Sequence, residues 1–404
     1  MPWSATQFPE TIRKTKVGRE NQILSADIQP FGRFPVVDQG QAFIAGYSDA
    51  EEKVIRDDLP LVVFGDHTRC LKYVDFPFIL GADGTKVLKP KEDLFDTKFF
   101  YYALLNLDIP NRGYNRHFTL LKEKNVPRPG KDEQLKIAGV LGVVQRAIEQ
   151  QDQLLQLAGE LKRTLLHQLF SHGSRSEPRA ETEIGLIPES WAVKPLGECC
   201  HVLSGSLSYT DFLDLPPADT VESVECMGVK VSDMNLPGNE IRFVSANAQK
   251  RLPLALAQKK LIPPDAVVFP KRGAAIATNK KRLTTTWTVL DPNLIAVSPR
   301  NGIDSEFLFY WAQTFDLKTI TDPGPTPQLN KKDLMPLLMP VPPDIEEQRN
   351  IATALSTLEA KIELNRRRQS SLQELFHTLL HQLMTAKMSV RDLDLSRLES
   401  TAAA

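Results

Sequence analysis

One segment of this sequence occurs twice, and this repeat limits the possible folds more than any other feature. Thr-Leu-Leu-His-Gln-Leu occupies Thr164–Leu169 and again Thr378–Leu383, an offset of 214 residues (378 − 164). The same offset aligns further identical residues without a gap: Glu133-Gln134 with Glu347-Gln348, Ile137-Ala138 with Ile351-Ala352, Leu141 with Leu355, Ile148-Glu149 with Ile362-Glu363, and Glu160-Leu161 with Glu374-Leu375. The repeated unit therefore extends well beyond the six identical residues.

The spacing of apolar residues indicates the structure of the repeat. Both copies step by four and three, the pattern of a coiled-coil seam. The second copy uses Ile351, Leu355, Leu358, Ile362, Asn365, Gln369, Leu372, Phe376, Leu379 and Leu383. The first copy uses Ile137, Leu141, Val144, Ile148, Gln151, Leu155, Ala158, Lys162, Leu165 and Leu169, with Lys162 as the one clear exception to the pattern. Each copy is predicted to be a helix of about 40 residues, ~60 Å long at ~1.5 Å per residue.

The two predicted helices are expected to pack on each other. A single heptad stripe would leave its seam in water, and a duplicated unit related by a pseudo-two-fold axis gives an antiparallel coiled coil. Gln151 and Asn365 fall near the middle of their helices, so we expect their amides to pair and to fix the register. At the start of the second helix, Asp344 is expected to cap it, with Glu347 at the capping-box position. The alternative is that each helix packs on its own globular domain.

The rest of the chain forms two globular segments that resemble each other. The predicted organisation is a first domain at 1–130, a long helix at 131–173, a second domain at 174–343, a second long helix at 344–387 and a tail at 388–404. Pro60–Phe64 resembles Asp265–Phe269, and Phe99–Tyr102 resembles Phe307–Tyr310. Short β-rich runs between Gly, Pro, Asn and Asp clusters, with one helical patch in each segment, predict α+β domains.

Composition excludes some classes of protein. No apolar run reaches the length of a membrane span, and the first residues lack the pattern of a secretory signal, so a cytoplasmic protein without a membrane partner is expected. The four cysteines form no CxxC pair, and we expect them to be reduced. The net charge is −1, so a generally basic surface cannot support nucleic-acid binding. However, the segment from Lys250 to Arg282 holds nine Lys and Arg residues against Asp265 alone.

This organisation resembles the specificity subunit of a Type I restriction-modification system. The resemblance rests on two divergent domains that alternate with two repeated helices, each entered through a proline-rich turn and the acidic-Gln pair Glu133-Gln134 or Glu347-Gln348. Ile187-Pro188-Glu189-Ser190-Trp191, followed by Pro195-Leu196-Gly197, is similar to the opening of a target-recognition domain in that family, and Arg33–Gly40 and Phe64–Arg69 resemble recurrent stretches of such domains. The first domain lacks a comparable Trp-xxxx-Leu-Gly opening.

The resemblance implies a non-catalytic subunit that recognises a DNA sequence. Each globular domain would read one half of an asymmetric, bipartite target in double-stranded DNA, while the helices would set the spacer and dock methyltransferase subunits, two in number. Methyl transfer and ATP-dependent cleavage would belong to partner subunits that use S-adenosylmethionine, ATP and Mg. A restriction subunit is a further partner that the resemblance implies.

Candidate DNA-binding residues follow from charge and from position after the β-rich runs, because phosphate contacts use Lys and Arg. In the second domain they are Lys271, Arg272, Lys259, Lys260, Lys280, Lys281 and Arg282. In the first domain they are His67, Arg69, Lys72, Asn115 and Arg116. Lys271 and Arg272 are the leading pair, because a turn beside Gly273 would present them. Each of these residues could instead be an ordinary solvated loop charge.

No catalytic or metal site is predicted. His377 and His381 have the i, i+4 spacing of a zinc site, but the Glu of HExxH is absent and both lie in heptad context. No phosphate-binding loop or amino-methyltransferase motif is present. Two other functions stay open: a coiled-coil scaffold that binds proteins and has no affinity for DNA, and a DNA-modifying enzyme with an unrecognised site.

Overall fold

The computed structural model describes residues 3–82, 84–113, 115–206, 223–246, 248–253, 260–321, 324 and 327–390, with the backbone alone at 223 and 248–253. The chain divides into two compact units. Unit 1 comprises Met1–Leu154 with Asn365–Ala404, and unit 2 comprises Leu155–Leu364. Each unit therefore contains one globular domain, the start of one long helix and the end of the other.

Unit 1 is built on two four-stranded sheets. The first has the order β2-β9-β6-β7, with bounds Ile12–Arg13, Thr85–Pro90, Leu61–Gly65 and Leu71–Val74. The second has the order β3-β8-β4-β5, with bounds Gln22–Ile23, Ile79–Gly81, Phe34–Val37 and Gly46–Ser48. Strand β6 is buried along its whole length, as expected for the apolar run Leu61–Phe64 on a central strand. Helix α2 (Thr97–Leu105) contributes Phe99, Phe100 and Tyr102 to the core.

Unit 2 repeats the first of these sheets. Its five-stranded sheet has the order β14-β21-β18-β19-β16, with bounds Cys200–Ser204, Leu294–Pro299, Val267–Pro270, Arg282–Thr284 and Arg242–Phe243. Its three-stranded sheet has the order β17-β15-β20, with bounds Ala248–Pro253, Ser223–Val229 and Thr288–Leu290. A hairpin joins β11 (Arg179–Thr182) to β12 (Gly185–Pro188). Helix α7 (Ser305–Ala312) corresponds to α2. Both domains are α+β, and the similar runs at residues 62–64 and 267–269 occupy the same place in equivalent sheets.

The openings of the two domains are also equivalent. In unit 1, β1 (Ser4–Gln7) pairs with β10 (Asn125–Arg128), the strand before the first long helix, and α1 (Phe8–Thr11) follows. In unit 2, β13 (Ala192–Pro195) pairs with β22 (Leu338–Val341), the strand before the second long helix, and α5 (Leu196–Cys199) follows. Trp3 therefore corresponds to Trp191, and Phe8 to Leu196. The first domain lacks the Leu-Gly of this opening, but Phe8-Pro9 replaces Leu196-Gly197 in the same structure.

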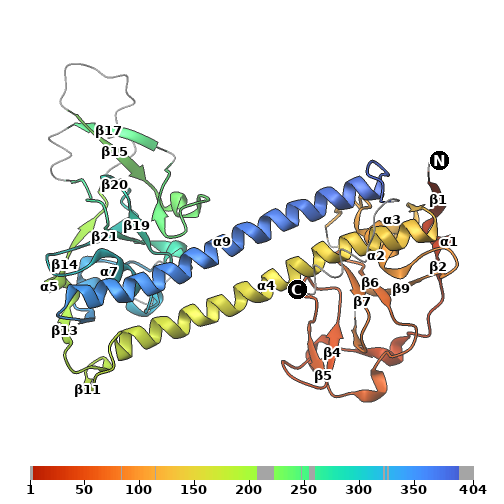
Figure 1. Cartoon of the computed structure of the whole chain (residues 1–404), viewed down its shortest axis with the longest axis horizontal. Coiled ribbons are helices and arrows are strands. Elements are labelled where there is room, and N and C mark those ends of the chain that lie inside the picture. Colours follow the sequence, from red (N-terminus) through yellow and green to blue (C-terminus); the bar gives the residue numbers. More distant parts are fainter. Residues whose placement is uncertain are drawn as a thin grey trace. The chain divides into compact units, whose positions relative to one another are not determined.

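Two long helices carry the repeat: α4 (Lys131–His172) and α9 (Ile345–Met384), drawn in yellow and blue in Figure 1. In unit 1, the first turns of α4 share a core with the last turns of α9, through Ile137 and Leu141 against Leu380 and Leu383. In unit 2, the last turns of α4 share a core with the first turns of α9, through Phe170 against Ile351. Within each unit the two helices therefore run antiparallel, as the repeat predicts.

Most of the predicted seam residues are buried or pack against a core. Those with exposed fractions below 5% are Ile137, Leu141, Ile351, Leu355, Ile362 and Leu383. Ile148, Leu165, Leu169 and Leu379 are half-buried and pack against the core of their unit. The exposed faces of both helices carry polar residues together with several leucines.

The predicted amide pair in the seam is wrong. The Nε2 of Gln151 is buried and has no hydrogen-bond partner within the described residues. Instead, the Nε2 of Gln369 donates to the carboxylate of Asp152. This contact sets Gln151 opposite Ser370. Asn365 lies five residues before Ser370, about 7.5 Å along the helix at ~1.5 Å per residue. Heptad spacing does not encode a shift of that size, because successive heptad layers carry the same apolar pattern.

The equivalent layer of the seam differs between the units. In unit 1, the hydroxyl of Tyr102 donates to Oε1 of Gln145 at 2.7 Å, and the Tyr102 ring packs on Phe376 with centroids 6.0 Å apart. The repeat offset aligns Gln145 with Glu359 and Phe376 with Lys162. In unit 2, Lys162 and Glu359 form an ion pair. Lys162, an exception to the apolar pattern, is therefore matched by an acid across the seam.

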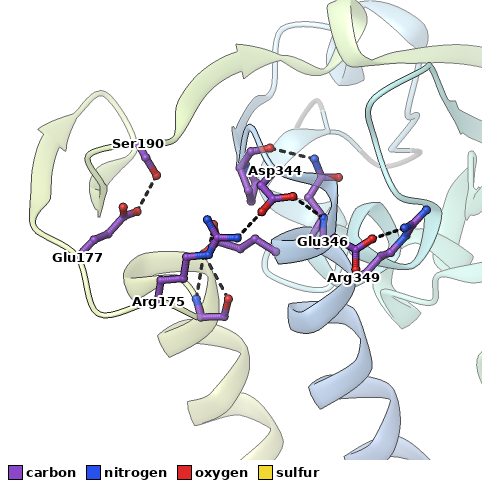
Figure 2. A network of polar contacts seen from close by, with 10 residues as sticks. Arg175, Glu177, Ser190, Asp344, Glu346 and Arg349 are labelled. Atoms are coloured by element: carbon purple, nitrogen blue, oxygen red, sulfur yellow. Dashed lines mark hydrogen bonds and ion pairs between the residues drawn. The ribbon is translucent and has the colours of Figure 1, made fainter.

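The start of α9 is held by a polar network (Figure 2). Asp344 Oδ1 accepts from the Glu346 amide at 2.9 Å, so Asp344 caps the helix as expected. Arg175, just after α4, pairs with the Asp344 carboxylate and approaches Glu347 at 3.8 Å. Glu347 accepts from the amide and the hydroxyl of Ser174, both at 3.3 Å. The Glu347 side chain therefore lies toward the end of α4, and it does not form the bond of a capping box at the start of α9.

No helix among the described residues is long and apolar enough to span a membrane.

Candidate nucleic-acid interface

In unit 2 the leading candidates, Lys271 and Arg272, follow directly after the central strand β18. The Lys271 amide donates to the Asn293 carbonyl at 2.7 Å, and its carbonyl accepts from Leu329 at 2.9 Å. Arg272 is exposed, and the 3-10 helix Gly273–Thr278 begins after it. Gly273 has a φ of +66° and donates to the Pro327 carbonyl at 3.0 Å. Backbone bonds on both sides thus present the Arg272 side chain to solvent.

Unit 1 has a matching arrangement after its central strand β6. The Asp66 carbonyl accepts from the His117 amide at 2.7 Å, and Asp66 Oδ1 accepts from the Phe118 amide at 2.8 Å. His117 is fully buried, with Nδ1 3.0 Å from the same carbonyl. These contacts hold the exposed residues Asn115 and Arg116 close to the loop that contains His67.

The two domains therefore present the same pair of loops. In each, the loop after the central strand is hydrogen-bonded to the loop that precedes a short helix, α3 (Phe118–Lys122) in unit 1 and α8 (Lys331–Leu334) in unit 2. The segment before α3 and the segment before α8 each lie beside the loop after the central strand of their own domain. Residues 114, 325 and 326 lie outside the described part of the chain.

Positive charge is concentrated at the unit 2 loops. Partial burial lowers the pKa of Lys271, and the neighbouring charges of Arg272 and Lys331 lower it further. Lys331 is exposed at the start of α8 and is absent from the sequence-based candidates. The dipeptide Lys331-Lys332 next to the Gly- and Pro-rich turn is the signal that could have revealed it. Three cations held this close create a site of positive potential, which suits a phosphate group.

The ammonium groups of two candidates, Lys72 and Lys281, are enclosed by the protein. Lys72 is 4% exposed, and its Nζ donates to the Ala42 carbonyl at 2.5 Å and lies 3.4 Å from Asp38. Lys281 is 1% exposed, and its Nζ donates to Asn279 at 2.8 Å and to the Phe315 carbonyl at 2.6 Å. Burial lowers the pKa of Lys281 to about 8.

The other candidates vary in accessibility. The Arg282 guanidinium donates to the carbonyls of Lys281 at 2.8 Å and Met234 at 3.3 Å, and burial lowers its pKa. Lys280 donates to Asn235, and Lys260 donates to the Ser206 carbonyl at 3.3 Å.

Arg69 has a φ of +63° and donates to the Ile109 carbonyl at 2.8 Å. Lys259 lies outside the described residues, as do the side chains of Lys250 and Arg251. Arg272, Asn115 and Arg116 are the exposed candidates within the described part.

The site holds no arrangement typical of a metal centre. Among the described residues, no group of three or more His, Cys, Asp or Glu side chains could hold a metal ion. His377 and His381 are exposed on α9.

Comparison with known proteins identifies relatives along most of the chain. The family model for the Type I restriction modification DNA specificity domain matches residues 188–374. The MjaX and MjaVIII Type I restriction enzyme specificity subunits of Methanocaldococcus jannaschii are each 23% identical to it, over 333 and 327 residues. These matches cover 78% and 76% of this chain, and 73% and 74% of the relatives.

Solved structures share the fold. The S subunit of the Type I restriction-modification system from M. genitalium matches with a TM-score of 0.57 at 17% identity, covering 95% of this chain and 93% of that chain. A chain from a structure of an assembled Type I system matches with a TM-score of 0.53 at 15% identity, covering 95% of this chain and 97% of that chain. Residues 188–374 are therefore similar to the Type I restriction modification DNA specificity domain, and the fold of the chain is similar to that of these two solved structures.

Proposed function

We propose that this subunit recognises an asymmetric, bipartite DNA sequence, with one half-site read by the domain of each unit. The observation that carries the proposal is the matched pair of loops: each domain presents exposed polar or cationic residues after the same central strand, held in place by the same kind of backbone contacts. The loops differ in sequence, so the two half-sites should differ. Arg272 in unit 2 and Arg116 in unit 1 are the phosphate contacts this proposal favours.

The long helices are proposed to set the spacer, meaning the base pairs between the two half-sites, and to dock two methyltransferase subunits. Surface residues of the repeat support the second role. Glu160, Leu161, Thr164 and His167 are exposed on α4, and their identical counterparts Glu374, Leu375, Thr378 and His381 are exposed on α9. Packing within this chain does not require identity at exposed positions. Two equal docking surfaces for two copies of one partner would require it.

Leu161 and Leu375 are the centre of these surfaces. They are 55% and 46% exposed, so both side chains are available to a partner. Other exposed leucines of the helices are not repeated: the offset aligns Leu135 with Arg349, Leu154 with Arg368, Leu157 with Ser371, and Leu364 with Gln150. Methyl transfer and ATP-dependent cleavage are proposed to belong to partner subunits, which would use S-adenosylmethionine, ATP and Mg.

The test is a domain exchange in the complete complex. Residues 1–130 are replaced by the corresponding domain of a related specificity subunit, and methylated positions are mapped in a genome that expresses each version with its methyltransferase. One half-site should change and the other should stay the same. Changes in both half-sites, or in neither, would contradict the proposal, and a chain with no DNA affinity at any salt concentration would favour a protein-binding scaffold.

A further inference from the structure

The acidic-Gln pair that opens both long helices has no role in the function described so far. Its glutamines, Gln134 in α4 and Gln348 in α9, are 0% and 1% exposed. A buried amide must satisfy two donors and an acceptor within the protein. The partners of these two amides are the basis of the inference.

In unit 1, Gln134 joins three segments. Its Nε2 donates to the Pro129 carbonyl, in the turn that leads into α4, and to the Leu94 carbonyl, in the recognition domain, both at 2.9 Å. Its Oε1 accepts from the Asp96 amide at 2.8 Å. Asp96 is itself the N-cap of α2, through its carboxylate and the Phe99 amide at 2.8 Å.

Unit 2 contains the same set of contacts. The Nε2 of Gln348 donates to the carbonyls of Pro342 and Gly302, both at 3.0 Å, and its Oε1 accepts from the Asp304 amide at 2.8 Å. Asp304 is the N-cap of α7, through the Phe307 amide at 3.0 Å. Leu94 and Gly302 each lie two residues before the capping aspartate. The two domains differ in sequence, yet each is attached to its long helix through the same three bonds, which we call the glutamine bridge.

We propose that Gln134 and Gln348 are positioning residues that fix the angle between each recognition domain and its long helix, and so make the subunit selective for spacer length. This inference rests on the proposed function, in which the helices set the spacer. One added base pair moves a half-site by about 3.4 Å and turns it by about 36°, since B-DNA has ~10 base pairs and ~34 Å per turn. A domain held at a fixed angle cannot follow that movement, whereas a loosely attached domain can.

The glutamine bridge is suited to this role because it restricts rotation of the domain on its helix. All donors of the amide are used, and each joins a different segment, so a rotation of the domain on its helix must break at least one buried hydrogen bond. Apolar packing between the same segments does not impose that limit, because it is non-directional.

The experiment measures spacer selectivity of the complete chain with its methyltransferase subunits. Duplexes carry the mapped half-sites at the native spacing, or with one base pair added or removed, and the ratio of dissociation constants defines the selectivity. Gln134→Met and Gln348→Met keep the size of the side chain and remove the bridge. Each should lower the selectivity on the order of tenfold, as expected for the loss of about one net hydrogen bond, while the preference for bases within each half-site is unchanged.

Two further variants separate positioning from general stability. Gln348→Glu keeps an acceptor for the Asp304 amide, so its selectivity should lie between those of the wild type and Gln348→Met. Gln156→Met removes an exposed amide that bonds only along α4, to Glu160 at 3.2 Å, and should keep full selectivity. If a methionine variant fails to fold, the glutamate variant decides the question alone.

The outcomes distinguish this inference from the function on which it rests. A wild-type complex that binds its bipartite target selectively, with bridge variants that fold and are equally selective for spacer length, overturns the inference only. A wild-type complex without a bipartite preference overturns the proposed function. A loss of base preference within one half-site in the methionine variants would also contradict a positioning role.

Discussion

The same layer of the helix seam has different chemistry in the two units. In unit 1, Tyr102 donates to Gln145 and packs on Phe376; in unit 2, Tyr310 occupies the place of Tyr102, and Glu359 pairs with Lys162. Tyr102 and Tyr310 each lie six residues after the capping aspartate of their helix. In both, burial is the main cause that raises the pKa of the phenol, and in unit 2 the charge of Glu359 raises it further.

This difference shows which parts of the repeat are constrained. In this layer both helices carry large side chains. In unit 1 they are a neutral amide and an aromatic ring, and in unit 2 they are an ion pair. We do not expect a combination of the two arrangements to be stable, because the Glu359 carboxylate is 7% exposed and requires a cation nearby. The glutamine bridge, by contrast, has the same residues and the same bonds in both units.

The largest effect is expected from breaking the ion pair alone. Lys162→Met leaves Glu359 buried beside the seam without its cation and should lower the free energy of unfolding of unit 2 by about 3 kcal/mol. Adding Glu359→Gln makes the layer neutral, as in unit 1, and should restore most of that loss. Urea denaturation followed by tryptophan fluorescence measures both variants. Equal stability of the single and the double variant would show that Glu359 is not a buried charge.

The next effect concerns the repeated surfaces centred on Leu161 and Leu375. Leu161→Glu and Leu375→Glu should each remove one of two methyltransferase subunits, with a loss at that site of about 2 kcal/mol or more, and the double variant should bind none. Mass photometry of the mixed subunits counts the copies. Leu157→Glu is the matched control, because Leu157 is 62% exposed but is not repeated. Two bound copies in the double variant would exclude these surfaces.

The third effect concerns Lys281, a buried lysine of unit 2. The folded pKa of Lys281 is about 8, below its ordinary value of 10.5. Between these values the unfolded chain binds a proton that the folded chain does not, so the free energy of unfolding rises with pH in that window. Below pH 8 both states are protonated, and the slope disappears. Wild-type stability measured relative to Lys281→Met should increase by about 2 kcal/mol from pH 7.5 to pH 10. A difference independent of pH would contradict the low pKa.

The smallest effect is expected for the neutral layer of unit 1. Tyr102→Phe removes the 2.7 Å hydrogen bond to Gln145 and should cost about 1 kcal/mol. A double-mutant cycle with Gln145→Leu should give a coupling energy of the same size, since each single variant removes the same bond. Additive effects would show that the bond contributes nothing to stability.

The repeat predicts the helices, their antiparallel packing and the α+β class, because heptad spacing and local similarity depend on short stretches of sequence. It does not predict the register. Gln151 and Asn365 are wrongly paired, since successive heptad layers carry the same apolar pattern and do not select one register. The match between Trp3 and Trp191 is also missed, because only one residue of the two openings is identical. It becomes evident in the structure, where the strand of each opening pairs with β10 or β22.

The candidate site is predicted only in part, for a similar reason. The loops after β6 and β18 lie at the expected places, but the sequence does not distinguish exposed Arg272 from enclosed Lys281. Both belong to short cationic runs within the same basic segment. What separates them is the Phe315 carbonyl, 34 residues away in the chain. Long-range contacts of this kind also bring Lys331 to Lys271.

Unit 1 is formed from both ends of the chain, and this affects the order in which the two units fold during synthesis. Its core joins Phe8 and Leu141 to Leu380 and Val390, residues translated near the beginning and near the end. Unit 2 can close its core once residue 364 has left the ribosome. The domain that is made first therefore completes its folding last, and until then the apolar face at the start of α4 lacks its cover and is open to chaperones or to aggregation.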